Sequence, residues 1–136
     1  LASVPAHIER SAMPRFRAAL QLMNSQPQDA QKAFAALARE YPMLSGPLTD
    51  LGILQARNRQ PKAALASFKR AIEANPLNAV ALNWCGTLYK EAGDFTQAEQ
   101  FYLKALTAKP DYAAATLNLG ILYEVALARP AEALNQ

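Results

Sequence analysis

Residues 82–110 read LNWCGTLYKEAGDFTQAEQFYLKALTAKP, and this stretch decides the fold. The core-type residues of its first part stand at i, i+3, i+4 and i+7, the spacing of one helix face: Leu82, Cys85, Gly86 and Tyr89. A turn signal, Gly93-Asp94, follows, and a second helical pattern runs on towards Pro110. Proline ends a helix because it has no amide hydrogen to donate. The stretch therefore predicts two helices joined by a short turn.

The same pattern recurs along the chain at one constant interval, the distance in sequence from Pro42 to Pro76, which we call the repeat period. Residues of matching size repeat at that spacing: Pro42, Pro76 and Pro110; Ala30, Ala64 and Ala98; Phe34, Phe68 and Tyr102; Gly52, Gly86 and Gly120; Leu54, Leu88 and Leu122. Agreement of several positions at one period predicts an array of stacked repeats. The predicted units are 11–44, 45–78, 79–112 and a partial fourth at 113–136, preceded by an N-terminal arm at 1–10.

Three of the repeated residues are glycines inside predicted helices, at 52, 86 and 120. Glycine in a helix costs about 1 kcal/mol relative to alanine. We expect close approach of the paired helix, with its aromatic residue, to offset this cost. A larger side chain at Gly86 would then overpack the crossing, at a cost of about 1–3 kcal/mol.

The pattern resembles the tetratricopeptide repeat, whose unit is a helix–turn–helix of about 34 residues. The third unit matches most fully and the second also matches, whereas the first is degenerate in its first helix, where Pro14 and Gln21 occupy signature positions. In the fourth unit, Pro130 comes one residue late. The resemblance implies an all-α fold, a right-handed α-solenoid of three units plus a partial fourth. It also implies a non-catalytic scaffold that binds a peptide or helix of a partner protein in a concave groove.

The resemblance further implies that a second face of each first helix lines this groove. Residues on that face differ between the units while the core-facing residues do not, as expected of a surface freed from packing. The candidate peptide-binding residues are Thr49, Ile53, Arg57, Asn83, Trp84, Thr87, Lys90, Leu117, Asn118, Ile121 and Glu124. Their mixed chemistry favours an extended or helical peptide with apolar anchors. Capture of a C-terminal carboxylate, as in co-chaperone members of the family, is not expected, because Asp50 and Trp84 replace two of the asparagines used there.

Trp84-Cys85-Gly86 is also how a thioredoxin-type redox site begins. Such a site needs a second cysteine just beyond, where Thr87 and Leu88 stand, and a βαβ pattern that this sequence lacks. We therefore interpret Cys85, the single cysteine, as a small buried hydrophobe. Trp84 points away from the core face. It either packs against a neighbouring repeat or is an exposed aromatic anchor for a ligand.

Composition argues against several functions. The chain has 14 Lys and Arg against 11 Asp and Glu, a net charge of +3, with no basic run, so nucleic acid is not an expected partner. An apolar stretch of about 18 residues, the minimum for a membrane span, is absent from the sequence. The sequence has no metal-ligand spacing and no catalytic motif, and His7 reads as a solvated surface residue. We expect no enzyme activity, no cofactor and no metal.

The last predicted helix begins near Pro130 and ends at Gln136, which is marginal for a helix alone. We therefore expect the natural chain to continue, or another molecule to cover this end. An alternative function follows: a structural module whose uncapped C-terminal end and N-terminal arm mediate homo-oligomerisation. The Ala- and Gln-rich sequence is bacterial in character, and the expected setting of the scaffold is a bacterial multiprotein assembly. The compartment stays open between the cytoplasm and, if a signal or anchor was removed, the periplasm or envelope.

Overall fold

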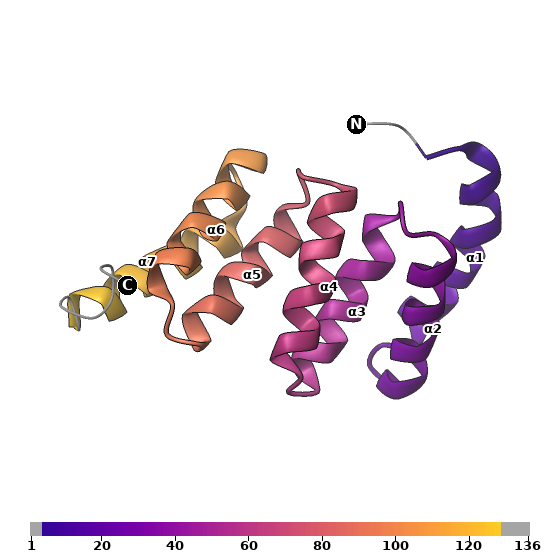
Figure 1. Ribbon diagram of the computed structural model, residues 1–136, viewed down its shortest axis with the longest axis horizontal. Helices are drawn as coiled ribbons and strands as arrows, with labels where there is room; N and C mark the ends of the chain where they lie inside the picture. Colours follow the sequence, from indigo (N-terminus) through magenta and orange to yellow (C-terminus); the bar gives the residue numbers. More distant parts are fainter. Residues whose placement is uncertain (1–3, 129–136) are drawn as a thin grey trace. The chain divides into compact units, whose positions relative to one another are not determined.

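The computed structural model describes residues 4–128, which form seven α-helices and no strand (Figure 1). The helices are α1 (Ala6–Leu22), α2 (Pro27–Glu40), α3 (Ser45–Arg57), α4 (Pro61–Ala74), α5 (Ala79–Glu91), α6 (Phe95–Ala108) and α7 (Ala113–Ala128). The first residues of α3, α5 and α7 are separated by the repeat period, and so are those of α2, α4 and α6. The predicted all-α class and helical period are therefore confirmed.

The first helix begins earlier than predicted. Helix α1 starts at Ala6, inside the predicted N-terminal arm, and has 17 residues against 13 in α3. The backbone oxygen of Pro5 accepts hydrogen bonds from the amides of Ile8 and Glu9, which closes the first turn. Residues 6–10 thus belong to α1 rather than to an arm. The repeat period could not reveal this extension because no other first helix shares it.

Helix starts follow the local sequence. Helices α2 and α4 begin with proline, whose fixed φ suits the first helical position. Helices α5 and α6 are capped by side chains: Asn78 Oδ1 accepts from the Ala81 amide at 3.0 Å, and Asp94 Oδ1 accepts from the Gln97 amide at 3.1 Å. Each cap satisfies an amide that has no partner within its helix.

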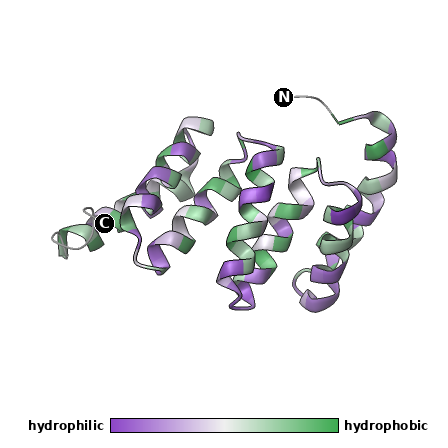
Figure 2. Cartoon of the chain, viewed as in Figure 1, coloured by the Kyte–Doolittle hydropathy of each residue, from purple (hydrophilic) through white to green (hydrophobic). Residues whose placement is uncertain are grey.

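The chain divides into two compact units, Leu1–Pro76 and Leu77–Gln136. The described helices of the first unit are α1 to α4, and those of the second are α5 to α7. Hydrophobic and hydrophilic residues follow one another along the helices, so that each helix can bury one side (Figure 2). One core cluster of the first unit contains Phe34, with the Phe16 ring packed edge-on at a centroid distance of 5.7 Å. A core cluster of the second unit contains Phe95, Tyr102 and Leu122.

Two of the three helix glycines lie at close crossings, as expected. A Cβ atom on Gly52 would lie 2.7 Å from Cε1 of Phe68, and one on Gly86 would lie 2.6 Å from Cδ1 of Tyr102. Both aromatic rings are fully buried. Gly120 differs, because a Cβ there would meet no atom within 4 Å among the described residues. The helix predicted to pair with it, near Pro130, lies outside the part of the chain that the structure describes.

Candidate functional site

In the second unit, two predicted binding residues link α7 to α5. Asn118 Nδ2 donates a hydrogen bond to Asn83 Oδ1 at 3.1 Å. Asn83 is only 7% exposed and Asn118 is half-buried. A buried amide needs such a partner, because an unsatisfied one costs free energy. Asn83 therefore serves packing between two helices, contrary to the expectation of a freely exposed groove residue.

Next to this pair, α7 carries an exposed apolar surface. Leu117 is 64% exposed and Ile121 is 38% exposed. The two residues stand at i and i+4, so they are neighbours on one helix face. Exposed Glu124 follows one turn later on the same side, and Lys90 on α5 is half-buried. We call Leu117 and Ile121 the α7 apolar face. Burying a fully exposed side chain of this size is worth about 1.5–3 kcal/mol, and covering these two would gain the share that corresponds to their exposed area.

Thr87 contacts the helix that it was predicted to avoid. Its Oγ1 atom lies 2.9 Å from the hydroxyl of Tyr102 on α6, and the two hydroxyls share a hydrogen bond. Tyr102 is fully buried, and burial raises the pKa of its hydroxyl while the hydrogen bond from Thr87 opposes the rise. A buried hydroxyl without a partner would be destabilising. Thr87 is therefore a hydrogen-bond partner of a core residue. This differs from the prediction that its helix face takes no part in packing.

The equivalent positions of the preceding repeat show why this happens. Ile53 stands one repeat period before Thr87, and Phe68 stands one repeat period before Tyr102. By this equivalence, the residue without a hydroxyl, Phe68, corresponds to an apolar partner position, whereas Tyr102 meets a residue that can donate and accept a hydrogen bond. This paired change was visible in the sequence and could have identified Thr87 as a packing residue.

In the first unit, the three predicted residues differ in exposure. Thr49 is 7% exposed, and its hydroxyl donates to the backbone oxygen of Ser45 at 2.8 Å. Ile53 is half-buried, and Arg57 is exposed. Thr49 is thus buried, contrary to the predicted free surface, and the bond to Ser45 satisfies its hydroxyl within its own helix. Arg57 remains accessible to a ligand.

Asp50, Trp84 and Asn118 occupy equivalent positions of three successive repeats, and each of these side chains is half-buried. Burial raises the pKa of Asp50 to about 6, and the positive charge of Arg57 opposes that rise. Trp84 is half-buried, so its indole ring is neither a core residue nor a fully exposed anchor. Both interpretations of Trp84 remain predictions. Cys85 is fully buried, which confirms its interpretation as a buried hydrophobe.

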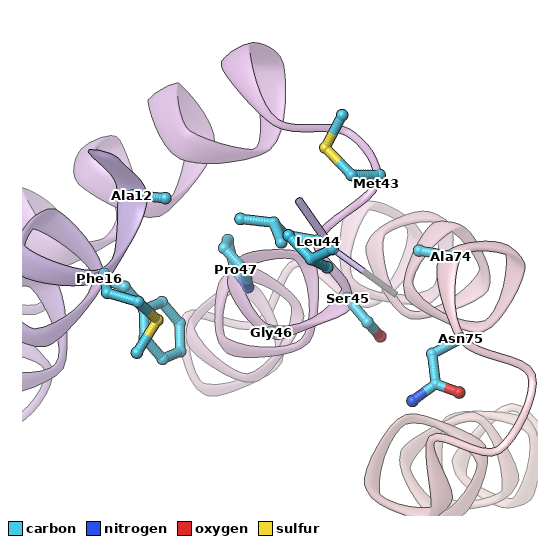
Figure 3. Close-up of a pocket in the computed structure, with 11 residues that line it drawn as sticks. Ala12, Phe16, Met43, Leu44, Ser45, Gly46, Pro47, Ala74 and Asn75 are labelled. Carbon is cyan, nitrogen blue, oxygen red and sulfur yellow. The ribbon is translucent and has the colours of Figure 1, made fainter. Parts of the chain in front are cut away.

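The sequence did not predict an apolar pocket of about 360 Å³ in the first unit (Figure 3). Leu44 and Pro47 lie in view between Phe16 and Met43, while Ser45 and Asn75 supply polar groups (Figure 3). The other lining residues are Val4, Ala12, Met13, Gly46 and Ala74. Methionine adapts its shape to varied apolar partners, and Met13 and Met43 are both exposed. We call this cavity the methionine pocket.

One residue difference brings the Phe16 ring close to α3 in the wall of this pocket. Gly46 occupies the position at which the next repeat has Val80. A Cβ atom at Gly46 would lie 3.3 Å from Cζ of Phe16, which is tighter than usual van der Waals contact. The exchange of valine for glycine between equivalent positions is the sequence signal that could have indicated this close approach.

Comparison with known proteins fits this architecture. A family model of the tetratricopeptide repeat matches residues 49–113 and 86–136. The chain belongs to the tetratricopeptide repeat family. The resemblance inferred from the repeat period is therefore confirmed. Two paired helices of each tetratricopeptide repeat correspond to α3 with α4 and to α5 with α6.

Curated relatives match this tetratricopeptide chain over about half its length. The probable UDP-N-acetylglucosamine–peptide N-acetylglucosaminyltransferase SPINDLY of Hordeum vulgare is 39% identical over 71 residues, which is 52% of this chain and 8% of the relative. The protein of the same description from Solanum lycopersicum is 41% identical over 71 residues, with the same two shares. The chain thus spans less than a tenth of these relatives.

Solved structures of tetratricopeptide proteins share the fold. The MamA protein is 23% identical with a TM-score of 0.76, covering 90% of this chain and 70% of that one. The first tetratricopeptide domain of Spaghetti (RPAP3), bound to the HSP90 peptide SRMEEVD, is 15% identical with a TM-score of 0.80, covering 88% and 95%. The Yersinia enterocolitica chaperone SycD, in complex with a peptide of the translocator YopD, is 15% identical with a TM-score of 0.77, covering 85% and 95%.

Two further findings concern residues 4–128 only. Among them, no group of three or more His, Cys, Asp or Glu side chains is placed to hold a metal ion. None of the helices in this part of the chain combines the length and the apolar character that a membrane crossing requires.

Proposed function

We propose that this tetratricopeptide repeat protein binds a segment of a partner protein, and that the α7 apolar face of its second unit is one contact surface. The observation that carries the proposal is the exposure of Leu117 and Ile121 beside the Asn118–Asn83 hydrogen bond. Apolar anchors flanked by amide groups suit a peptide, whose side chains need cover and whose main chain needs hydrogen-bond partners. The peptide complexes of RPAP3 and SycD support the same mode for this fold.

The surrounding charges indicate which partner would fit. Exposed Glu124 follows Ile121 by one turn on α7, and half-buried Lys90 belongs to α5, which contacts α7, so both signs of charge are present on these two helices. We expect a partner segment with one or two apolar side chains and polar flanks of both signs, in extended or helical form. In the first unit, the methionine pocket would take another apolar side chain. That the partner belongs to a bacterial multiprotein assembly stays a prediction.

Catalysis is not part of the proposal. Cys85, the single thiol of the sequence, is fully buried, and a reactive thiol must be accessible to its substrate. The curated relatives are described as transferases, but the match covers only 8% of the Hordeum vulgare protein. A binding role therefore accounts best for the exposed apolar and amide groups.

The proposal is tested with peptides selected on the wild-type protein from a random peptide library. The test variant is Leu117→Glu with Ile121→Glu, and the matched control is Leu103→Glu, which alters a leucine 45% exposed on α6. We expect the test variant to lose at least about tenfold in affinity for the selected peptides, since burying a charge in an apolar contact is costly. The control should bind normally. Undiminished binding by a folded test variant would reject the proposal.

A second candidate function, self-association, is favoured by the distribution of charge. Residues 1–76 contain ten Lys and Arg against five Asp and Glu, whereas residues 77–136 contain four against six. Oppositely charged units attract each other across copies, in head-to-tail fashion. The predicted contribution of an uncapped C-terminal end lies outside the described residues. Sedimentation velocity over a range of protein and salt concentrations tests the idea, and a monomer under all conditions would eliminate it.

A further inference from the structure

A groove runs between α2 and the C-terminal half of α3, within the first unit. It consists of two adjoining pockets of about 420 and 330 Å³, which share Gln28, Gln31 and Asn58 as lining residues. The remaining lining residues are Met23, Asn24, Pro27, Leu54 and Arg57 in one pocket and Lys32, Ala35, Leu51 and Gln55 in the other. We call this the amide groove. Its α2 side belongs to the second helix of a pair and lies outside the first-helix face predicted from the sequence, whereas Arg57 belongs to both surfaces.

Five of the lining side chains are primary amides, and contacts on the groove's edge orient three of them. Gln31 Nε2 and Asn58 Nδ2 both donate to Oε1 of Gln60, at 3.3 and 3.4 Å. These two amides therefore keep their oxygens as acceptors. Gln55 Oε1 accepts from Ser67 Oγ at 2.6 Å, so Gln55 keeps its NH₂ group as a donor. The groove thus offers acceptors and a donor, the two kinds of group that pair with the N–H and C=O of a peptide main chain.

The charges of the groove have one sign. Arg57 and Lys32 are both exposed cations, and none of the lining residues is a carboxylate. Asp29, the acidic neighbour on α2, lies between Gln28 and Lys32 in sequence but does not line either pocket. Two cations with an open, solvated approach favour an anionic ligand and speed its association.

The shape and lining of the groove distinguish between classes of anionic ligand. None of the lining residues in this part of the described chain is aromatic. Nucleic-acid bases are usually held by stacking on aromatic side chains, so a nucleic acid is disfavoured.

The length of the groove indicates the length of its ligand. From Gln28 to Ala35 the helix extends about 10 Å, which matches about three residues of extended chain. Met23 in one pocket and Ala35 in the other supply apolar lining for side chains of such a segment.

We propose that the amide groove binds a short, extended, acidic segment of a partner protein, at a site separate from the α7 apolar face. Gln31 and Asn58 accept hydrogen bonds from its main-chain amides, and Gln55 donates to a main-chain carbonyl. Arg57 and Lys32 contact its acidic side chains. The site does not depend on the proposed function of the second unit, because every group that carries it belongs to the first.

The probe is an acetylated and amidated hexapeptide in which glutamate alternates with leucine, compared with the same peptide carrying lysine in place of glutamate. Nuclear magnetic resonance of the ¹⁵N-labelled chain follows the side-chain NH₂ signals of Gln31, Gln55 and Asn58 during titration. We expect the glutamate peptide to shift these signals saturably. The lysine peptide should leave them unchanged. Shifts of equal size with both peptides, or no shift of these signals with either, would overturn the proposal.

Two matched double variants test the charges. Replacing Arg57 and Lys32 by glutamine should raise the Kd of the glutamate peptide about twofold to fivefold for each charge removed, the range of exposed ion pairs. The control replaces Arg70 and Lys62, exposed cations of the same unit on α4 that line neither pocket, by glutamine. An equal loss in both variants would show that only net charge matters, and would overturn the site.

A third variant separates this proposal from the function proposed above. Leu117→Glu with Ile121→Glu should bind the glutamate peptide as the wild type does while losing the peptides selected from the library. If that variant also loses the glutamate peptide, the peptide binds on the second unit, and the amide groove is not its site. If it keeps both kinds of peptide, the function proposed for the α7 apolar face fails while the amide groove stands.

Discussion

The hydroxyl of Tyr102 lies 2.9 Å from Oγ1 of Thr87, beside the point where Gly86 lets the Tyr102 ring approach α5. The ring fills the crossing of α5 and α6, and the hydroxyl forms a hydrogen bond with Thr87. Packing and polar satisfaction at this crossing therefore depend on three residues together.

Replacing Thr87 by valine keeps the shape of the side chain but removes the partner of the buried Tyr102 hydroxyl. We expect a loss of about 1–3 kcal/mol in the free energy of unfolding. The double variant Thr87→Val with Tyr102→Phe removes both hydroxyls, as in the Ile53 and Phe68 pair, and should recover most of that loss. Urea unfolding of the single and double variants measures the coupling. Simple additivity of the two changes would contradict the proposed partnership.

Glycine-to-alanine changes should have opposite effects at two equivalent positions. Gly86→Ala places a Cβ atom 2.6 Å from the Tyr102 ring and should cost about 1–3 kcal/mol through overpacking. Gly120→Ala meets no described atom within 4 Å and should gain up to about 1 kcal/mol, since alanine is the better helix former. Thermal and urea unfolding of both variants give the comparison. A loss at Gly120 as large as that at Gly86 would mean that another part of the chain contacts Gly120.

The turn between α3 and α4 contains a strained residue. Arg59 has a φ of 58°, in the left-handed region, and the equivalent turn between α5 and α6 has Gly93 with a φ of 85°. Glycine adopts this region without the steric cost that a Cβ atom brings. We expect Arg59→Gly to stabilise the chain by about 0.5–1 kcal/mol and Gly93→Ala to destabilise it by about 1 kcal/mol. Urea unfolding measures both, and the reverse order of stabilities would contradict the turn geometry.

The pKa of Asp50 makes stability depend on pH. Because burial raises it from 3.8 to about 6, the folded chain binds a proton more tightly than the unfolded chain does. The contribution of the protonated carboxyl group is fully present below pH 3.8 and is lost as the pH rises through about 6. Asp50→Asn should therefore be more stable than the wild type by about 1 kcal/mol at neutral pH, after allowance for solvent screening.

The control for Asp50→Asn is the same comparison at acid pH. Well below pH 3.8 the wild-type carboxyl group is neutral in both states, so the two proteins should have nearly equal stability. Urea unfolding from neutral to acid pH gives the difference directly. A difference that does not change with pH would show that Asp50 titrates normally.

The fold was predictable because the residues that make helix crossings possible recur with matching sizes. Gly52 with Phe68 and Gly86 with Tyr102 are pairs of small and large residues at fixed spacing, and the structure places each pair in contact. Such pairs depend on one helix pair alone, so a period in sequence reveals them. The early start of α1 has no counterpart in another repeat and was missed for that reason.

The candidate site was less predictable because exposure depends on what each side chain finds nearby. Helical spacing correctly placed Thr49 and Asn83 on first helices of their repeats. It did not predict that both side chains would be buried and hydrogen-bonded in the folded chain. The methionine pocket has residues of α1, α3 and the end of α4 in its wall, and the amide groove is formed by amides on two helices that share no period. Neither feature has a regular spacing that the sequence could display.

The matching of Ile53 to Phe68 and of Thr87 to Tyr102 limits how repeats of this kind can be recombined. Transplanting α3 alone into the place of α5 would set an isoleucine against the Tyr102 hydroxyl, whereas transplanting α3 together with α4 would keep the match. The helix pair, rather than the single helix, is therefore the smallest piece of this chain that can be exchanged, duplicated or used as a building block without leaving a polar group stranded in the interior.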